Sequence, residues 1–228
     1  METKDLDVVY FVKYGYGNEE LRYSLRSVCK NMPHKRVWIF GGCPKNIVPD
    51  VRVRVVQEGR TKWDKVRNMF IMACENKEIT DDFIMFNDDF FVMRPMKKIE
   101  PLYRDTLKGH IEHLPAGAYR DLLKTSLGEL GEGALSYELH TPFVFNKKKL
   151  LDLINKTPEL HCTRTLYGNT YKIGGTKHSD VKVFDSNPDF DYKQSALLST
   201  DDAVINTNNM IWSYIKRSFP NKSEFELF

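Results

Sequence analysis

The stretch that most constrains this chain runs from Asp82 to Met93 and reads DFIMFNDDFFVM. Four apolar residues lead into Asn87-Asp88-Asp89, and Phe90-Phe91-Val92 follow at once. A short continuous run of this kind is typical of a strand buried on both faces, as in a parallel sheet. Two adjacent carboxylates at the end of such a strand are costly to desolvate unless a cation lies beside them.

Two interpretations of the Asp88-Asp89 pair are open from these residues. Carboxylate oxygens suit Mg²⁺ or Mn²⁺, and such an ion often carries a substrate phosphate as well. The carboxyl end of a strand in an open α/β sheet is also where ligands bind. Alternatively, the two side chains cap backbone N–H groups in a strand-end turn.

Length and composition indicate a single soluble domain over residues 1–228. The chain is long enough for one α/β domain with a full core. We expect no membrane span, because no window approaches 18 apolar residues, and no signal peptide at the N-terminus. Four scattered cysteines with no CxxC pair are typical of reduced thiols, so we expect a cytoplasmic location. The net charge of +3 is too small to indicate nucleic-acid binding by itself.

The order of the predicted elements indicates a parallel sheet with crossover helices. Apolar and β-branched runs predict strands over 7–12, 36–40, 51–56, 83–86, 136–145 and 181–184. Apolar residues at helical spacing predict helices over 19–31, 61–77, 122–130, 147–155 and 210–218. Asn18 and Thr61 are the expected N-caps of the first two helices.

Cations in the first turns of the predicted helix over 61–77 favour an anion site. Lys62, Lys65 and Arg67 lie where a helix N-terminus disfavours positive charge. A bound phosphate would resolve this conflict, because helix N-termini and basic side chains both attract it. A solvated basic face is the alternative explanation.

Five segments in chain order carry a recognisable pattern: DVVY at 7–10, ELRYSLRSV at 20–28, FNDDFF at 86–91 followed by Arg94-Pro95, His140-Thr141-Pro142, and FPNKSEFE at 219–226. Together they resemble the Stealth family of sugar-phosphate transferases. Small phage-type glycosyltransferases, including those that decorate hydroxymethylated pyrimidines in DNA, look similar too. The resemblance implies a GT-A-like (Rossmann-like) α/β fold, a mostly parallel sheet flanked by helices, and a nucleotide-sugar donor such as a UDP-sugar.

The resemblance also implies roles for residues around the donor. Asp7, expected at the end of the first strand, would contact the nucleoside. Lys65 and Arg67 would hold the diphosphate. Asp88 and Asp89 would bind Mn²⁺ or Mg²⁺, which neutralises charge on the leaving nucleoside diphosphate.

The remaining implied roles concern the acceptor side of the site. His140 would be the general base that takes the proton from the acceptor hydroxyl, although a lone histidine is often structural. Arg164 would clamp a phosphate, or else form a surface ion pair. Asp201 and Asp202 would supply a second metal contact or an acceptor contact, or else an N-cap for the segment that follows.

Three functions are compatible with these features. The leading hypothesis is a metal-dependent glycosyltransferase that moves a sugar to a hydroxyl, with a 5-hydroxymethylpyrimidine in phage DNA as acceptor. Such an enzyme would flip the base into its pocket, and aromatic residues lie beside cations at Trp63, Tyr103-Arg104 and Tyr119-Arg120. The alternatives are a Stealth-like sugar-phosphate transferase acting on a polysaccharide or glycan, and a non-catalytic module that binds a sugar nucleotide or DNA.

Overall fold

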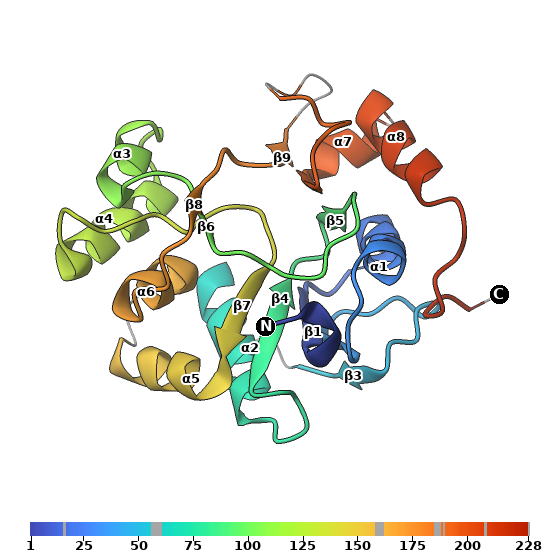
Figure 1. Cartoon of the computed structure of the whole chain (residues 1–228), viewed down its shortest axis with the longest axis horizontal. Helices are drawn as coiled ribbons and strands as arrows, with labels where there is room; N and C mark the ends of the chain where they lie inside the picture. The colour runs from blue at the N-terminus through green and yellow to red at the C-terminus, as the bar shows by residue number, and fades with distance from the viewer. Residues whose placement is uncertain are drawn as a thin grey trace.

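A five-stranded sheet forms the centre of the protein (Figure 1). The structure is a computed structural model, and it describes residues 1–15, 17–55, 61–157, 162–184, 188, 190–207 and 209–227. The strand order is β3-β2-β1-β4-β7, and only β7 runs antiparallel to its neighbour. The strands are β1 (Asp7–Val12), β2 (Val37–Gly41), β3 (Val51–Val53), β4 (Asp82–Phe86) and β7 (Phe143–Asn146). The predicted α/β class with a mostly parallel sheet flanked by helices is confirmed.

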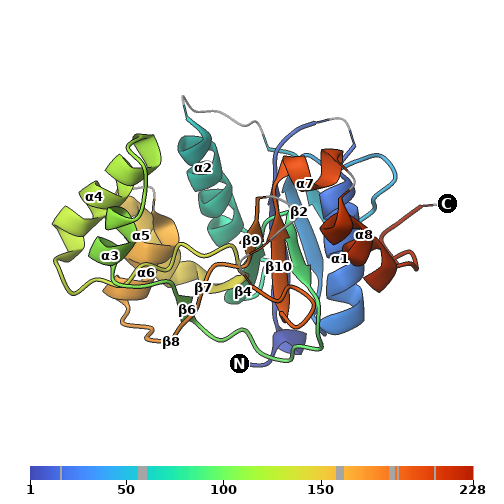
Figure 2. The same cartoon turned by 90° about the horizontal axis from the view of Figure 1, so that it is seen from above.

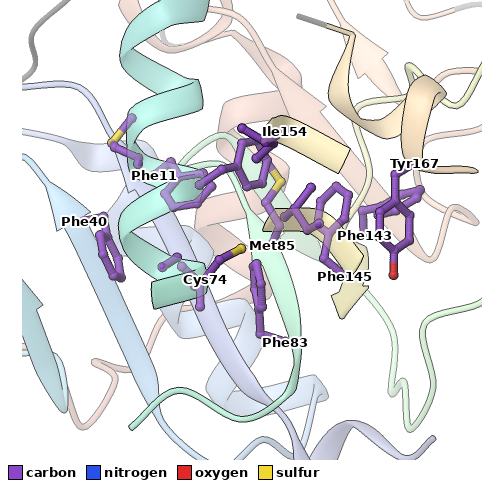
Figure 3. Close-up of a cluster of buried hydrophobic side chains, with 14 of the residues drawn as sticks. Phe11, Phe40, Cys74, Phe83, Met85, Phe143, Phe145, Ile154 and Tyr167 are labelled. Atoms are coloured by element: carbon purple, nitrogen blue, oxygen red, sulfur yellow. The ribbon is translucent and has the colours of Figure 1, made fainter. Parts of the chain in front are cut away.

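Helices cover both faces of this sheet (Figure 2). On one face, α2 (Lys62–Glu75) and α5 (Lys147–Lys156) pack on side chains from the sheet such as Val9, Phe83 and Phe145. Figure 3 shows this aromatic-rich core, in which Phe11 and Phe145 lie among the labelled rings. On the other face, α1 (Glu19–Asn31) covers the opposite side chains of the same strands. Burial on both faces explains why β1 and β2 are apolar throughout their length.

A second, three-stranded sheet lies beyond the carboxyl end of β4. Its order is β5 (Phe90–Val92), β10 (Leu197–Thr200) and β9 (Lys182–Val183). Side chains of α1 bond the open edge of β5: Ser27 Oγ accepts from Val92 N at 2.9 Å, and Asn31 Nδ2 donates to Val92 O at 2.6 Å. The polar positions of α1 therefore satisfy backbone groups that no strand pairs. The helices α7 (Asp202–Asn206) and α8 (Met210–Ser218) pack on the other side of this sheet.

The remaining elements form a helical lobe beside α5. Figures 1 and 2 both place α3 (Leu107–Glu112) and α4 (Ala118–Leu130) at the end of the molecule next to α6 (Thr163–Thr170). A short pair, β6 (Leu102–Tyr103) and β8 (Thr176–Lys177), connects this lobe to the sheet, and a 3-10 turn, η1 (Thr3–Asp5), precedes β1. In the described parts of the chain, every helix is too short or too polar to cross a bilayer.

The predicted elements are found, with differences at their ends. Asn18 and Thr61 are N-caps, and Thr61 forms a capping box with Asp64. The predicted strand over 136–145 is wrong in its first half, since only Phe143–Asn146 pairs in the sheet. The helix predicted over 122–130 starts earlier, at Ala118. Residue 56 of the strand predicted over 51–56 lies outside the described residues.

Candidate functional site

Asn87, Asp88 and Asp89 follow β4 at the carboxyl edge of the sheet, and each enters different surroundings. Asn87 lines a cavity of about 660 Å³. Asp88 lines a separate cavity of about 490 Å³ beside the N-terminus of α1. Asp89 is buried against β10. The loop after β4 therefore divides two cavities at the edge where parallel sheets bind ligands.

Asp89 already has a cationic partner. Its Oδ2 atom accepts hydrogen bonds from Lys182 Nζ at 2.7 Å and from Ser199 Oγ at 2.8 Å. Both side chains of the ion pair are largely buried. The Lys182 ammonium thus compensates the charge that sequence reasoning assigned to a metal ion.

Asp88 lies instead in an acidic environment. Asn18 Nδ2 donates to Asp88 Oδ2 at 2.6 Å, while Asn18 Oδ1 caps α1 by accepting from Leu21 N at 2.8 Å. Burial raises the pKa of Asp88, and the neighbouring Asp89 carboxylate adds to the rise. Burial also raises the pKa of Glu20 to about 8, with further contributions from Asp88 and Asp89. Crowded carboxylates of this kind favour a cation.

Of the other two predicted acidic residues, one lines this cavity and the other caps a helix. Asp202 lines the same cavity as Asp88 and Glu20. Asp201 caps α7, since its side chain accepts from Val204 N at 3.2 Å. Within the described residues, no group of three or more His, Cys, Asp or Glu side chains is arranged to hold a metal ion. A cation bound beside Asp88 would therefore need oxygen ligands from a substrate or from water.

His140 lies in the larger cavity and is paired with a carboxylate that the sequence did not single out. His140 Nδ1 is 2.8 Å from Asp180 Oδ2, and the His140 backbone N–H donates to Asp180 Oδ1 at 3.0 Å. Arg104 also donates to Asp180. Burial alone would raise the pKa of Asp180, but the hydrogen bonds from His140 and the charge of Arg104 outweigh it and hold that pKa well below its ordinary value.

Arg164 lines the same cavity from the first turn of α6 and is 8% exposed. Its guanidinium donates to the Leu139 carbonyl oxygen, lies 3.3 Å from the Met85 sulfur, and stacks 5.5 Å from the Phe90 ring centroid. Burial lowers the pKa of Arg164. Among the described residues no carboxylate lies within ion-pair distance, so the predicted surface ion pair is not observed. A buried cation without a paired anion favours an anionic ligand.

Three of the predicted donor-binding residues lie away from these cavities. Asp7, expected at the end of the first strand, is the first residue of β1 and lies at the end of the strand away from the cavities. It accepts from Arg36 Nη2 at 3.1 Å and from Thr80 N at 3.0 Å at the opposite edge of the sheet. On α2, the larger cavity is lined by Lys62, Trp63, Val66 and Phe70, whereas Lys65 and Arg67 belong to other faces of the helix. Arg67 donates to the Ile154 carbonyl oxygen at 2.9 Å, which joins α2 to α5.

His110 is one of the residues lining the larger cavity, and its burial makes the stability of the fold depend on pH. Its Nδ1 is 2.7 Å from Ser136 Oγ, and its side chain is almost fully buried. Burial and the nearby Arg104 charge lower the pKa of His110 to about 4. His110 is therefore protonated near pH 6.5 in the unfolded chain but only near pH 4 in the folded chain. The free energy of unfolding falls as the pH drops from 6.5 towards 4.

His110→Asn is expected to remove that part of the acid loss while keeping a partner for Ser136. The free energy of unfolding of the wild type should fall by on the order of 2 kcal/mol more than that of the variant between pH 7 and pH 4.5. Urea denaturation at both pH values measures the difference. Equal losses in the two proteins would contradict the assignment, and comparing the two cancels the contributions of Glu20 and Asp88, which the proteins share.

Comparisons with known proteins give limited likenesses. No family model matches the sequence, and no curated protein matches it either. Two solved structures of the glycosyltransferase GlyE from Streptococcus pneumoniae TIGR4 align with parts of this chain. The apo form aligns with a TM-score of 0.39 and 12% identity over 77% of this chain and 45% of that chain. The other aligns with a TM-score of 0.36 and 10% identity over 95% of this chain and 50% of that chain, so the aligned region spans about half of the GlyE chain.

Proposed function

We propose that this protein is a transferase that moves the sugar of a nucleotide sugar to an acceptor hydroxyl, with His140 as the general base. One observation carries the proposal. A histidine paired with a buried carboxylate shares one cavity with Arg164, a buried guanidinium that no carboxylate of the described chain pairs. This combination suits removal of a proton from a hydroxyl next to a group that carries negative charge.

The His140 ring is arranged for this proton transfer. Its Nδ1 faces Asp180, so Nε2 is the ring nitrogen left for substrate. The His140 side chain is 36% exposed, which allows a hydroxyl to approach it. Asp180 would stabilise the imidazolium that forms when the hydroxyl proton moves to Nε2. The acceptor oxygen would then attack the sugar, and the nucleoside diphosphate would leave.

Positive charge on the cavity wall would stabilise the leaving group. Arg164 is fixed by the Leu139 carbonyl and the Phe90 ring, so little reorganisation is needed when charge develops. Lys62 lines the same cavity from the first turn of α2, with its ammonium 4.9 Å from the Trp63 ring centroid. Of the three cations predicted in the first turns of this helix, Lys62 would therefore take the diphosphate-binding role that the resemblance implied for Lys65 and Arg67.

A divalent cation, Mn²⁺ or Mg²⁺, is part of the proposal, and Asp88 is the residue that would hold it. Asp88 has crowded acidic neighbours, whereas Asp89 is already neutralised by Lys182. Because Asp88 lines the smaller cavity and His140 the larger one, the ion would neutralise charge on the leaving nucleoside diphosphate where the donor passes Asn87 from one cavity to the other. Asn18 would orient the Asp88 carboxylate through the 2.6 Å hydrogen bond that joins them.

Exchanging each carboxylate for an amide distinguishes the proposed metal-binding role of Asp88 from the ion-pair role of Asp89. Asp88→Asn is expected to weaken Mn²⁺ binding at least tenfold, because it removes the proposed ligand and its charge. Asp89→Asn is expected to change Mn²⁺ affinity much less and instead to lower the melting temperature, because it leaves Lys182 buried without its partner. Isothermal titration with Mn²⁺ in the presence of a nucleoside diphosphate measures the first effect, and thermal denaturation measures the second. The reverse ranking of affinities would assign the metal to Asp89.

Sugar-phosphate transfer to a glycan is the second candidate, because the unpaired Arg164 guanidinium and His140 line one cavity. A phosphate transferred to the acceptor would lie between them in that reaction. Incubating the protein with Mn²⁺ and a panel of nucleotide sugars, with hydroxymethylated DNA or with glycan acceptors, tests both. Release of a nucleoside diphosphate supports glycosyl transfer, and release of a monophosphate supports sugar-phosphate transfer. If the protein binds a nucleotide sugar but transfers nothing to any of these acceptors, it is a binding module, and the proposal is contradicted.

A further inference from the structure

The segment between β8 and β9 contains the one carboxylate in direct contact with His140 among the described residues. Asp180 lies in this segment and is largely buried, with 15% of its side chain exposed. Its two oxygens accept hydrogen bonds from His140 N at 3.0 Å, from Val181 N at 2.9 Å, from the His140 ring, and from Arg104. Such a carboxylate is held from several sides at once and has little freedom to turn.

The charge of this carboxylate determines which nitrogen of His140 carries the proton. An ionised carboxylate only accepts hydrogen bonds, so a neutral His140 ring bonded to it must present N–H at Nδ1. The lone pair is then on Nε2. In the opposite tautomer, the Nδ1 lone pair would face the Asp180 oxygen 2.8 Å away, which is repulsive.

Arg104 supports Asp180 from the other side. The Arg104 backbone N–H donates to the Ser136 carbonyl oxygen at 2.8 Å, which anchors the residue before α3. Its guanidinium then reaches Asp180 and forms an ion pair with it. The cation lowers the cost of burying the carboxylate and favours its ionised form.

We propose that Asp180 is a positioning residue that holds His140 in the tautomer with the proton on Nδ1 and the lone pair on Nε2. This inference rests on the proposed role of His140 for its functional meaning, but the tautomer itself is a property of the free protein. The same short segment also fixes Asp89, since Lys182 pairs with it at 2.7 Å. Residues 180–182 therefore contact both His140 and the aspartate pair that follows β4.

Nitrogen-15 NMR of histidine-labelled full-length protein at pH 8 tests the tautomer directly. The His140 signals are identified by their loss in His140→Asn. In the wild type we expect Nδ1 to be protonated and Nε2 to be unprotonated. A wild-type ring with its proton on Nε2 would overturn the proposal, and this result does not depend on the folding of any variant.

Asp180→Asn is the matching perturbation. The variant is expected to shift His140 towards the Nε2-protonated form and to lower kcat about 100-fold or more, with the KM for the sugar donor within about twofold. Asp105→Asn is the control, because Asp105 is also an ion-paired aspartate, bonded to Lys177 at 2.8 Å, but lies outside both cavities. It should leave the His140 spectrum unchanged.

The two readouts separate failure of this inference from failure of the proposed function. An unchanged His140 spectrum in Asp180→Asn, or equal loss of kcat in Asp105→Asn, would overturn the positioning role. If the wild type turns over no sugar nucleotide, the proposed function fails, while the wild-type and variant spectra still decide the role of Asp180.

Discussion

His140→Asn is expected to lower kcat for sugar transfer by about 10²- to 10⁴-fold, the usual contribution of a general base. Asparagine can still donate a hydrogen bond to Asp180, so the network around Arg104 is kept. It cannot accept the acceptor's proton. Because the leaving group is bound by other residues, the KM for the sugar donor should change little. Steady-state kinetics with the best donor from the panel measures both constants.

His178→Asn is the matched control for this experiment. His178 belongs to the same segment as Asp180, but it is exposed and its Nδ1 lies 2.6 Å from the Ser179 carbonyl oxygen. It lines neither of the two cavities at the end of β4. We expect wild-type kinetics from this variant. Unchanged kcat in His140→Asn would remove the histidine from the reaction and with it the central step of the proposed mechanism.

The elements of the sheet were predictable because their signals are local. β1, β2 and β4 are short apolar runs, and α1 and α2 carry apolar stripes behind clear N-caps. The prediction of a strand over 136–145 was wrong in its first half because these residues are buried by packing against other parts of the chain, without pairing in a sheet. Tyr137 N donates to the Thr165 hydroxyl oxygen, and Ser136 N donates to the Asp105 carbonyl oxygen. Side chains and loops thus satisfy backbone groups that the sequence pattern assigned to strand pairing.

The candidate site was only partly predictable, because its decisive pairs are distant in sequence. The sequence identified the Asp88-Asp89 loop, but Lys182, which neutralises Asp89, is 93 residues away. Asp180 is 40 residues from His140 and carries no local signal. Asp7 was misplaced for a simpler reason: it begins β1, so it faces the edge of the sheet opposite to the cavities. Pattern reasoning finds residues at strand ends but does not show which partners already occupy them.

The segments 20–28 and 219–226, which carried much of the family resemblance, are joined by a buried ion pair. Arg26 Nε and Nη2 each donate to a Glu226 carboxylate oxygen at 2.7 Å. A third donor, Arg26 Nη1, reaches the Phe219 carbonyl oxygen at 3.0 Å. The Arg26 and Glu226 side chains are 8% and 3% exposed. The pair fixes the C-terminal segment on the middle of α1.

Glu226→Ala is therefore expected to lower the free energy of unfolding by on the order of 3 kcal/mol, because it leaves a buried guanidinium without its anion. The Arg26→Ala, Glu226→Ala double variant should lose less than the sum of the two single variants, since the remaining partner is no longer stranded. Glu132→Ala is the control, as its ion pair with Lys108 is exposed and worth about 0–1 kcal/mol. Urea denaturation near pH 7 measures the wild type and all four variants.

The pH dependence of the same pair provides an independent check. Burial would raise the pKa of Glu226, but hydrogen bonds from Arg26 and Ser223 outweigh it and lower that pKa below its ordinary value of 4.5. The stabilisation is therefore complete above pH 4.5 and is lost as the pH falls below it. The difference in free energy of unfolding between the wild type and Glu226→Ala should shrink in that acid range.

Because α1 also carries Asn18 and Glu20 at the Asp88 cavity, a loosened helix should weaken Mn²⁺ binding as well. A Glu226→Ala protein as stable as the wild type would show that the two segments are not joined through this pair.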